Sequence, residues 1–246
     1  MGRVHIEGIR RLGYVDVAAV AGSSDEKAKK FADSMYVEKS TGDWRSLLSD
    51  ESLDAVHICT PNADHHPMAK AAMEAGKHVL LEKPITVNSQ EARDLVQIAK
   101  EKNLANCLQH NLRYYPVVQH IRQMVKAGDL GEILVAQGTY SQDWLLYDTD
   151  YNWRVGSEAN GQLRVMGDIG SHWMDLAQHL TGLSVKSICA DLTIVHRIRK
   201  RPKVSVETFA GKTLRPEDYE DVTIRTEDFG MCLLNLGDRA KGCFTV

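Results

Sequence analysis

The sequence predicts an α/β protein. Its first half should form a doubly wound parallel sheet of the Rossmann type, and its second half an α+β domain with a mostly antiparallel open sheet. In the first half, short β-rich runs alternate with helical patterns, as they do in βαβ units. After about residue 111, strand-like runs follow one another without helices between them, which indicates antiparallel pairing. With 246 residues and 43% apolar side chains, the chain can bury two modest cores.

Local signals mark several helix boundaries in the first half. Pro67 suits the first turn of a helix, and Gly76 suits the position just after its end. Asn88 and Glu91 have the spacing of a capping box at the start of the next helix. The buried face of that helix should carry Ala92, Leu95, Val96 and Ala99. We predict strands over residues 15–21, 53–59, 78–81 and 104–109, and a helix over 25–33.

The second half has fewer helices and longer strand-like runs. One predicted helix covers 116–127 and ends at Gly128, and another covers about 170–180. A loop over 142–154, rich in Trp, Tyr and Asp, lies between them. We interpret the basic run 197–203 as a solvated loop, with an anion-binding patch as the alternative. Predicted strands cover 132–140, 185–195, 221–226, 231–236 and 242–246.

Charge and composition argue against several classes of protein. The 33 acidic and 30 basic residues leave no global excess of positive charge to attract nucleic acid or an anionic membrane. No apolar run approaches the ~20 residues that span a bilayer, and the first residues lack the apolar core of a secretory signal. We therefore expect a cytoplasmic protein without nucleic-acid or membrane partners. The five cysteines lie in apolar stretches, which predicts small core residues in a reducing compartment rather than disulfides or metal ligands.

Polar residues follow the ends of two neighbouring predicted strands. Thr60, Pro61 and Asn62 follow one strand, and Glu82 and Lys83 follow the next. Ligands bind at the carboxyl ends of the strands in doubly wound sheets. For residues 60–62 ordinary turn chemistry is an equal interpretation, because Pro and Asn favour turns. Lys83 is different, since a lysine followed by proline at the end of a buried strand is hard to explain as a flexible surface charge.

A second group of polar residues lies near residue 170. Asp168 and His172 are four residues apart and share a face if the segment is helical, and Asp175 and His179 continue the stripe. A metal site would need a third ligand type at a familiar spacing, which is missing. The polarity of an exposed helix face is a second interpretation. We favour a third interpretation, in which His172 transfers a proton near neutral pH and Asp168 orients the substrate or the imidazole.

These segments together resemble the glucose-fructose oxidoreductase/inositol dehydrogenase (Gfo/Idh/MocA) family. The resemblance rests on Thr-Pro-Asn at 60–62 with His65, Glu-Lys-Pro at 82–84 and Gly-Asp-Ile-Gly-Ser-His at 167–172, and it spans essentially the whole chain. It implies a dinucleotide-binding domain over 1–111 and a substrate-binding and oligomerisation domain over 112–246. It also implies hydride transfer between NAD or NADP and a secondary alcohol or carbonyl of a sugar or polyol, in a homo-oligomer such as a dimer or tetramer.

The resemblance also implies roles for single residues. Lys83, Asp168 and His172 would form the catalytic group, and Glu82 would touch the nicotinamide ribose. Arg113 and Trp153 would join Asp168 and His172 in contacting the substrate. The loop over 142–154 suits either stacking on sugar faces, as in family members that act on anhydrosugars, or a subunit contact. The residues expected to bind the cofactor are Gly2, Arg3, Ser23, Ser24, Thr60, Pro61, Asn62, His65, Glu82, Lys83 and Asn111.

The chain departs from the family pattern at its N-terminus. It lacks the first strand and the first two glycines of Gly-x-Gly-x-x-Gly, so we expect the numbering to begin inside the gene product. Because that strand is central in a doubly wound sheet, two internal strands should be left with unpaired edges. The second domain should likewise be incomplete at its C-terminus. The second strand is followed by Gly22-Ser23-Ser24 instead of an acidic residue, which leaves NAD and NADP equally open.

Two rival functions follow from other features. A non-catalytic binding or assembly subunit would keep the fold without the cofactor, and the absent glycine-rich turn motivates this hypothesis. Nucleic-acid binding through the basic run 197–203 would give a salt-sensitive affinity, and we expect none.

Overall fold

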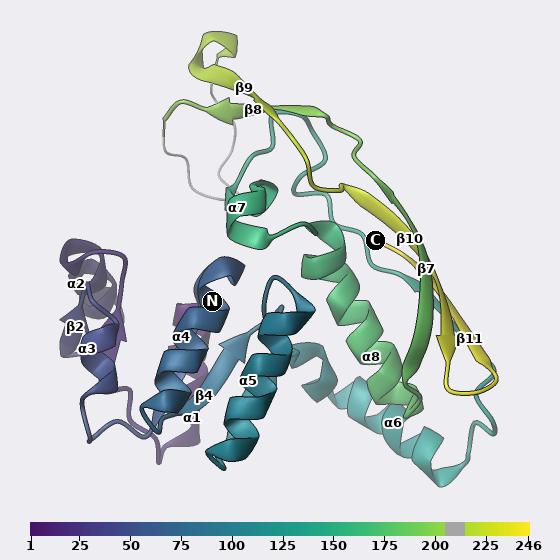
Figure 1. The fold of residues 1–246 in the computed structure, drawn as a ribbon, viewed down its shortest axis with the longest axis horizontal. Helices are drawn as coiled ribbons and strands as arrows, with labels where there is room; N and C mark the ends of the chain where they lie inside the picture. Colours follow the sequence, from purple (N-terminus) through teal and green to yellow (C-terminus); the bar gives the residue numbers. More distant parts are fainter. Residues whose placement is uncertain (205–214) are drawn as a thin grey trace. The chain divides into compact units, whose positions relative to one another are not determined.

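The computed structural model describes residues 1–204 and 215–246 (Figure 1). The chain divides into two compact units, Met1–Gln109 and His110–Val246. Each unit has its own hydrophobic core.

Unit 1 alternates helices with short parallel strands. The strands form two ladders, one of β1 with β2 and one in the order β3-β4-β5. Among the described residues no ladder joins β1 to β3, so the predicted gap between internal strands is confirmed. The elements are α1 (Gly2–Leu12), β1 (Ala19–Ala21), α2 (Asp25–Ser34), β2 (Lys39–Thr41), α3 (Arg45–Leu48), β3 (Ala55–Ile58), α4 (Asn62–Glu74), β4 (His78–Glu82), α5 (Ser89–Glu101) and β5 (Asn106–Gln109).

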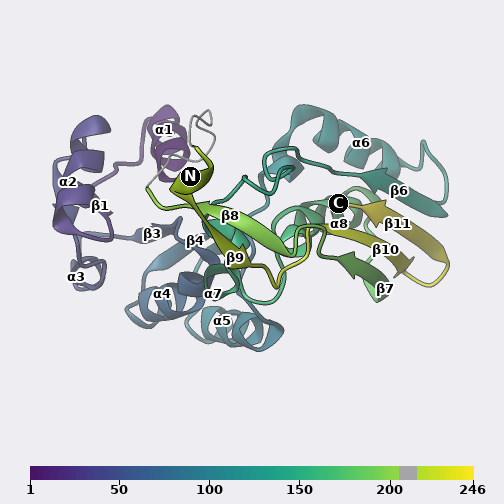
Figure 2. The ribbon, with the colours of Figure 1, turned by 90° about the horizontal axis from the view of Figure 1, so that it is seen from above.

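Helices cover both faces of the strands in unit 1. In Figure 2, α1 lies on one side of β3 and β4, and α4 and α5 lie on the other. Ile58, Val79 and Leu81 of the strands pack against Met73 of α4 and Leu95 of α5. Ala55 and His57 of β3 and Cys107 of β5 remain exposed, so these strands are buried mainly through the side chains that meet α4 and α5.

The helix boundaries in unit 1 correct two predictions. Helix α4 begins at Asn62, so Pro67 lies inside it rather than in its first turn. Pro61 occupies the N-cap position, which means that an earlier proline marks the start of this helix. Helix α5 begins as predicted, because the Asn88 side chain accepts hydrogen bonds from the backbone N–H groups after it. Val96, however, is 46% exposed and does not belong to the buried face.

Unit 2 is built around a four-stranded mixed sheet in the order β6-β11-β10-β7, in which only β6 and β11 run parallel. A separate antiparallel pair joins β8 to β9. The helical elements are η1 (Asn111–Tyr114), α6 (Pro116–Ala127), η2 (Trp153–Val155), α7 (Ser157–Asn160), the π-helix η3 (Met166–Gly170), α8 (Ser171–Thr181) and η4 (Pro216–Asp218). The strands are β6 (Val135–Thr139), β7 (Val185–Thr193), β8 (Ile198–Pro202), β9 (Tyr219–Thr223), β10 (Phe229–Leu236) and β11 (Ala240–Thr245).

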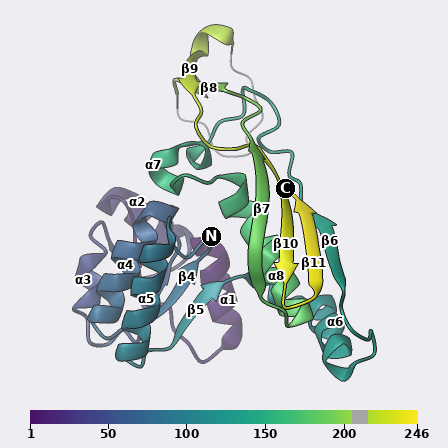
Figure 3. The same cartoon turned by 45° about the vertical axis from the view of Figure 1, so that its right-hand side comes forward.

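Helix α8 covers one face of the four-stranded sheet (Figure 3). The indole of Trp173 stacks on the ring of Phe244, with centroids 4.5 Å apart. Gly138 of β6 lies under this indole, and a Cβ atom there would come within 2.5 Å of Trp173 Nε1. The close approach of strand and helix therefore requires glycine at this position.

The basic run 197–203 is a strand, which corrects the prediction of a solvated loop. Arg199 is fully buried and pairs with Asp228. Lys200 pairs with Asp221 and Arg201 with Glu220 on the neighbouring strand β9. Arg197, Arg201 and Lys203 remain exposed, so the run is solvated as predicted except at Arg199, whose acidic partner lies far along the chain.

The cysteines are less buried than predicted. All five are free thiols, but only Cys232 lies fully in a core. Cys107 and Cys189 are exposed, because each lies on an outward-facing position of its strand. Across the two described stretches, no helix combines the length and the apolar character that a membrane span needs.

Candidate active site

In unit 1, the residues after β3 and β4 are brought together at one edge of the sheet. These strands are parallel neighbours, so Thr60 and Asn62 emerge beside Glu82 and Lys83. His65 ties the two connections together. Its Nδ1 lies 2.7 Å from the carbonyl oxygen of Pro84, and its Nε2 lies 3.1 Å from the carbonyl oxygen of Thr60.

The imidazole of His65 is completely buried, and both of its nitrogens contact protein carbonyls. A neutral imidazole donates through only one nitrogen, so one of the two contacts is a hydrogen bond at any moment. Neither nitrogen is left over for a ligand. The geometry therefore gives His65 the task of fixing two loops, and its contact with a cofactor stays a prediction.

The Thr60 hydroxyl is buried and makes no hydrogen bond with the described residues. A buried hydroxyl is normally paired, which makes this atom a candidate to meet a ligand. Asn62 is also buried, at the first position of α4, where Pro61 is the N-cap. This edge of the sheet thus fits a polar group such as the hydroxyls or amide of a dinucleotide.

Glu82 is held from the other side by His5 of α1. His5 Nε2 lies 2.9 Å from Glu82 Oε1, and His5 Nδ1 lies 3.1 Å from His57 Nδ1. Hydrogen bonds to Cys59 and Glu82 raise the pKa of His5 to about 9, although burial opposes them. Burial alone would raise the pKa of Glu82, but the hydrogen bond and charge of His5 lower it overall. Burial lowers the pKa of His57, with a further contribution from the charge on His5.

The remaining cofactor residues predicted in unit 1 lie at two helix starts. Gly2 and Arg3 occupy the first turn of α1, and the Arg3 side chain is exposed. Ser23 and Ser24 follow β1. The hydroxyl of Ser24 accepts a hydrogen bond from Lys27 N at 3.3 Å and so caps α2. This capping contact gives Ser24 a structural task within unit 1.

In unit 2, Asp168 lies in the π-helix η3, directly before α8. One π turn inside a helix is rare and is often found at functional sites. Arg154 Nε lies 3.3 Å from Asp168 Oδ2. The Arg154 guanidinium also lies over two indoles, 4.8 Å from the ring centroid of Trp144 and 4.5 Å from that of Trp153. The sequence placed Arg154 in the aromatic loop but gave it no individual role.

His172 is the second residue of α8 and lies among other rings of unit 2. Its ring meets that of His110 edge to face, with centroids 5.5 Å apart, and that of Tyr140 at 6.3 Å. His110 begins this unit, and Asn111, the predicted cofactor residue, follows it in η1. Asp168 and His172 therefore lie at the start of α8, and η1, which carries Asn111, is a neighbouring element.

Arg113 has a protein partner in unit 2, and its contact with a substrate stays a prediction. Its guanidinium pairs bidentately with Asp175 of α8, through Nε at 2.7 Å and through Nη2. A bidentate pair fixes both partners, so Arg113 joins η1 to α8. His179 lies further along the same face, where burial and then the charges of Arg122 and Arg113 lower its pKa. Asp175 and His179, the last two residues of the predicted polar face, therefore contact other side chains of unit 2.

The loop over 142–154 is anchored by the buried arginine of β8, which sequence reasoning missed. Arg199 donates hydrogen bonds to the carbonyl oxygens of Leu145, Tyr147 and Asp150, at 2.8 to 3.0 Å. It also donates to Asp228, which pairs with Arg164 as well. No local pattern could have revealed this anchor, because its partners lie between 29 and 54 residues away.

The loop borders a cavity of about 190 Å³ in unit 2. Trp144, Arg154 and Asp168 line this cavity together, beside the buried Arg199 and Asp228. An indole, a cation and a carboxylate offer both a flat apolar surface and hydrogen-bonding groups. Within the described stretches, no group of three or more His, Cys, Asp or Glu side chains is arranged to hold a metal ion.

Comparisons with known proteins agree with this two-part organisation. Residues 1–110 match the oxidoreductase family with an NAD-binding Rossmann fold, and residues 118–246 match the GFO/IDH/MocA C-terminal domain. The chain is 31% identical to levoglucosan dehydrogenase of Pseudarthrobacter phenanthrenivorans over 224 residues. This alignment covers 91% of the chain and 56% of the relative. It is 34% identical to D-xylose 1-dehydrogenase (NADP(+)) of Hypocrea jecorina over 131 residues. That alignment covers 52% of the chain and 34% of the enzyme.

A solved structure of levoglucosan dehydrogenase in complex with NADH and levoglucosan resembles the whole chain. The TM-score is 0.86 at 27% identity, and the match covers 100% of this chain and 63% of that one. The chain thus spans less than two thirds of the length of these relatives. Both of its units match models of one family, and the chain belongs to the Gfo/Idh/MocA oxidoreductase family.

Proposed function

We propose that the protein transfers a hydride between a nicotinamide dinucleotide and a secondary alcohol or carbonyl carbon of a sugar or polyol. The observation that carries this proposal is the polar edge of the sheet in unit 1. There a buried, unpaired Thr60 hydroxyl lies beside Glu82 and Lys83, on loops that His65 holds together. Doubly wound sheets bind dinucleotides at this edge.

Unit 1 supplies the groups that would hold the dinucleotide. The first turn of α1, with Gly2 and Arg3, offers backbone N–H groups of the kind that bind phosphate oxygens. The carboxylate of Glu82 would accept hydrogen bonds from the ribose next to the nicotinamide. His65 would act by fixing the loops, and Asn111 of η1 would complete the cofactor contacts. We propose residues 1–111 as the dinucleotide-binding domain and 112–246 as the substrate-binding and oligomerisation domain.

The nicotinamide supplies the hydride chemistry when it is bound, and three side chains would serve it. The Lys83 ammonium would stabilise negative charge that develops on the substrate oxygen. His172 would take the hydroxyl proton, because an imidazole accepts and returns protons near neutral pH. Asp168 would orient the substrate or the imidazole through its carboxylate.

A sugar or polyol fits the surroundings of Asp168. Trp144, which lines the cavity, and Trp153, which the Arg154 guanidinium covers on one side, would provide flat apolar rings, and the Asp168 carboxylate would accept hydrogen bonds from hydroxyl groups. The relatives named after levoglucosan and D-xylose support this substrate class. Arg113 is already engaged by Asp175, so we propose a positioning role for it rather than a substrate contact.

Either NAD or NADP fits the residues after β1. Gly22 packs so closely on α2 that a Cβ atom would come within 2.9 Å of Ala28 N. Ser23 and Ser24 bring neither a carboxylate for ribose hydroxyls nor an arginine for a phosphate. Titration with NADH and with NADPH, followed by nicotinamide fluorescence, measures the preference directly.

The same titration separates this proposal from a non-catalytic role. Binding of either reduced cofactor, with turnover of a sugar or polyol that is lost in Lys83→Ala and in His172→Ala, supports the oxidoreductase. Failure to bind both cofactors contradicts it and favours a binding or assembly subunit. Turnover should be followed as the absorbance of reduced nicotinamide, across aldoses, anhydrosugars and polyols.

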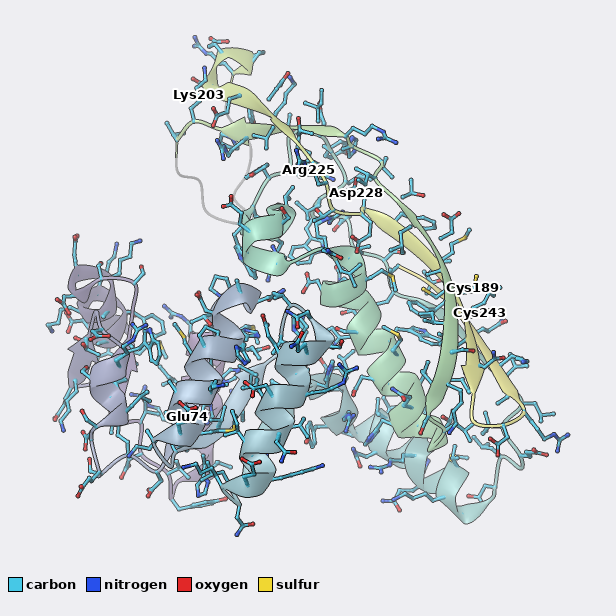
Figure 4. The ribbon with its side chains drawn as sticks, viewed as in Figure 1. Glu74, Cys189, Lys203, Arg225, Asp228 and Cys243 are labelled. Carbon is cyan, nitrogen blue, oxygen red and sulfur yellow. The ribbon has the colours of Figure 1, made fainter. Side chains whose placement is uncertain are left out.

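We also propose that the protein forms homo-oligomers, dimers or tetramers, through the face of the sheet opposite α8. This outer face carries Phe229, Met231 and Leu233 of β10, and Leu233 is 64% exposed. Cys189 and Cys243 flank Leu233 on the neighbouring strands and lie on the same side of the sheet (Figure 4). A contiguous apolar patch on an open sheet suits a second copy of the same face. Five free thiols support a reducing compartment such as the cytoplasm.

A further inference from the structure

We propose that Arg154 is a positioning residue for this reaction, which holds the Asp168 carboxylate in its working orientation. The inference rests on the proposed function, in which Asp168 orients the substrate or His172. It goes beyond that function because it assigns a task to a side chain outside the catalytic group. All of its evidence lies within unit 2.

The first observation is the contact between the two charges. Arg154 Nε lies 3.3 Å from Asp168 Oδ2, and the two side chains are 24% and 18% exposed. Arginine keeps its positive charge at any pH at which a protein is folded. The contact between the guanidinium and the carboxylate lies mostly out of water, where screening by salt is weak.

The second observation is that Arg154 is itself fixed. Its guanidinium lies 4.8 Å from the Trp144 ring and 4.5 Å from the Trp153 ring, so two indoles hold one planar cation. Arg199 anchors the backbone of the loop that carries Trp144. A long, flexible side chain that is held in this way has lost its conformational entropy before the substrate binds. Binding therefore does not have to order this side chain, as a positioning role requires.

The third observation concerns the backbone under Asp168. The Glu227 carboxylate accepts hydrogen bonds from Arg164 N at 2.8 Å and Met166 N at 2.9 Å, at the start of the π-helix. These contacts hold the main chain that leads to Asp168. The carboxylate of Asp168 is then directed by Arg154, beside the cavity that both residues line.

A direct contact between Arg154 and the sugar is the competing explanation, and a double-mutant cycle separates the two. We expect Arg154→Met, which keeps the apolar stem, to lower kcat about 10- to 100-fold while KM changes by less than about threefold. In an Asp168→Asn background the same substitution should change kcat by less than about twofold, because the residue acts through Asp168. Equal losses in both backgrounds, or a loss confined to KM, would overturn the proposal.

Rescue experiments test the same claim in a second way. Arg154→Lys keeps the charge but not the planar group that fits between two indoles, so its kcat should fall between those of the wild type and Arg154→Met. Added methylguanidinium should restore activity to Arg154→Ala and not to the Arg154→Ala, Asp168→Asn double variant. Absence of rescue, together with full activity of Arg154→Met, contradicts the proposal.

The control is Arg45→Ala, which removes a guanidinium stacked 4.4 Å from the Trp44 ring at an exposed site in unit 1. It should leave kcat and KM unchanged. If Arg154→Met unfolds, as judged by circular dichroism, the cycle is repeated with Arg154→Lys. A wild-type protein that turns over no sugar refutes the proposed function. Turnover that depends on His172 but not on Arg154 refutes only this inference.

Discussion

His5 Nε2 lies 2.9 Å from Glu82 Oε1, and the two side chains are only 5% and 8% exposed. The pair joins the first helix of the chain to the carboxyl end of β4, where the cofactor is proposed to bind. Hydrogen bonds to Cys59 and to Glu82 hold the pKa of His5 at about 9, and the hydrogen bond and charge of His5 keep the pKa of Glu82 below its ordinary value. A charged pair in this position makes the stability of unit 1 depend on pH.

The first prediction concerns this pH dependence. The pKa of His5 is raised in the folded state, so its contribution to stability is complete below pH 6.5 and disappears as pH rises toward about 9. At about 1.4 kcal/mol per pKa unit, the loss is on the order of 3 kcal/mol at most. Urea unfolding between pH 6 and 9.5 measures it. His5→Gln should remove most of this pH dependence, and exposed His120→Gln should not. A wild-type profile that is flat over this range would refute the charged pair.

The second prediction concerns His65, whose imidazole spans the connections after β3 and β4. We expect His65→Ala to lower the free energy of unfolding by about 2 to 4 kcal/mol, because a buried cavity opens and one carbonyl loses its hydrogen-bond donor. NADH affinity should fall as well, since both loops are proposed to line its site. The neighbouring His66 is the matched control, because it pairs with Asp94 near the surface. His66→Ala should cost about 1 kcal/mol or less. Similar costs for the two variants would contradict the bridging role.

The third prediction concerns the anchor of the aromatic loop. Arg199→Met should lower the free energy of unfolding by about 3 to 5 kcal/mol, because three carbonyls and Asp228 lose a buried donor. Denaturant unfolding monitored by tryptophan fluorescence measures the change. Arg201→Met, two residues along the same strand, removes a half-exposed pair with Glu220 and a contact with Tyr151, and should cost about 1 kcal/mol or less. Equal free energies of unfolding for the two variants would contradict the anchoring of the loop by Arg199.

The fourth prediction concerns the outer face of the sheet. Leu233→Glu places a carboxylate at the centre of the patch formed with Phe229 and Met231. We expect it to shift the protein to a smaller oligomer in sedimentation or light-scattering measurements, without loss of secondary structure. Lys241→Glu alters the charge of the same face away from this patch and should have a weaker effect. An unchanged molar mass for Leu233→Glu would show that this face is not the interface.

Sequence reasoning succeeded where local signals decide the structure. Helix α6 runs from Pro116 to Ala127 as predicted, because proline suits a first turn and Gly128 adopts the left-handed conformation that ends a helix. The same proline signal failed at Pro67, since Pro61 already begins that helix. The parallel pairing of β3, β4 and β5 followed from the alternation of strands and helices.

The candidate site was predictable only in part, for a physical reason. The motifs placed Thr60, Glu82 and Lys83 at strand ends, where the fold itself brings them together. The contacts of Arg199 and Arg113 depend on partners many residues away, and nothing in their own neighbourhoods distinguishes a buried pair from a solvated charge. Long-range pairing of charges is a property of the folded chain and leaves no local pattern.

The central claim is that Lys83, Asp168 and His172 act on one carbon beside the nicotinamide. A crystal structure of the protein with reduced nicotinamide dinucleotide and a sugar or polyol tests it most directly. The account predicts that the Lys83 ammonium and the His172 imidazole both lie within about 3 Å of the same substrate hydroxyl, with the Asp168 carboxylate against the substrate or the imidazole. A complex in which these groups face different surfaces would contradict the account.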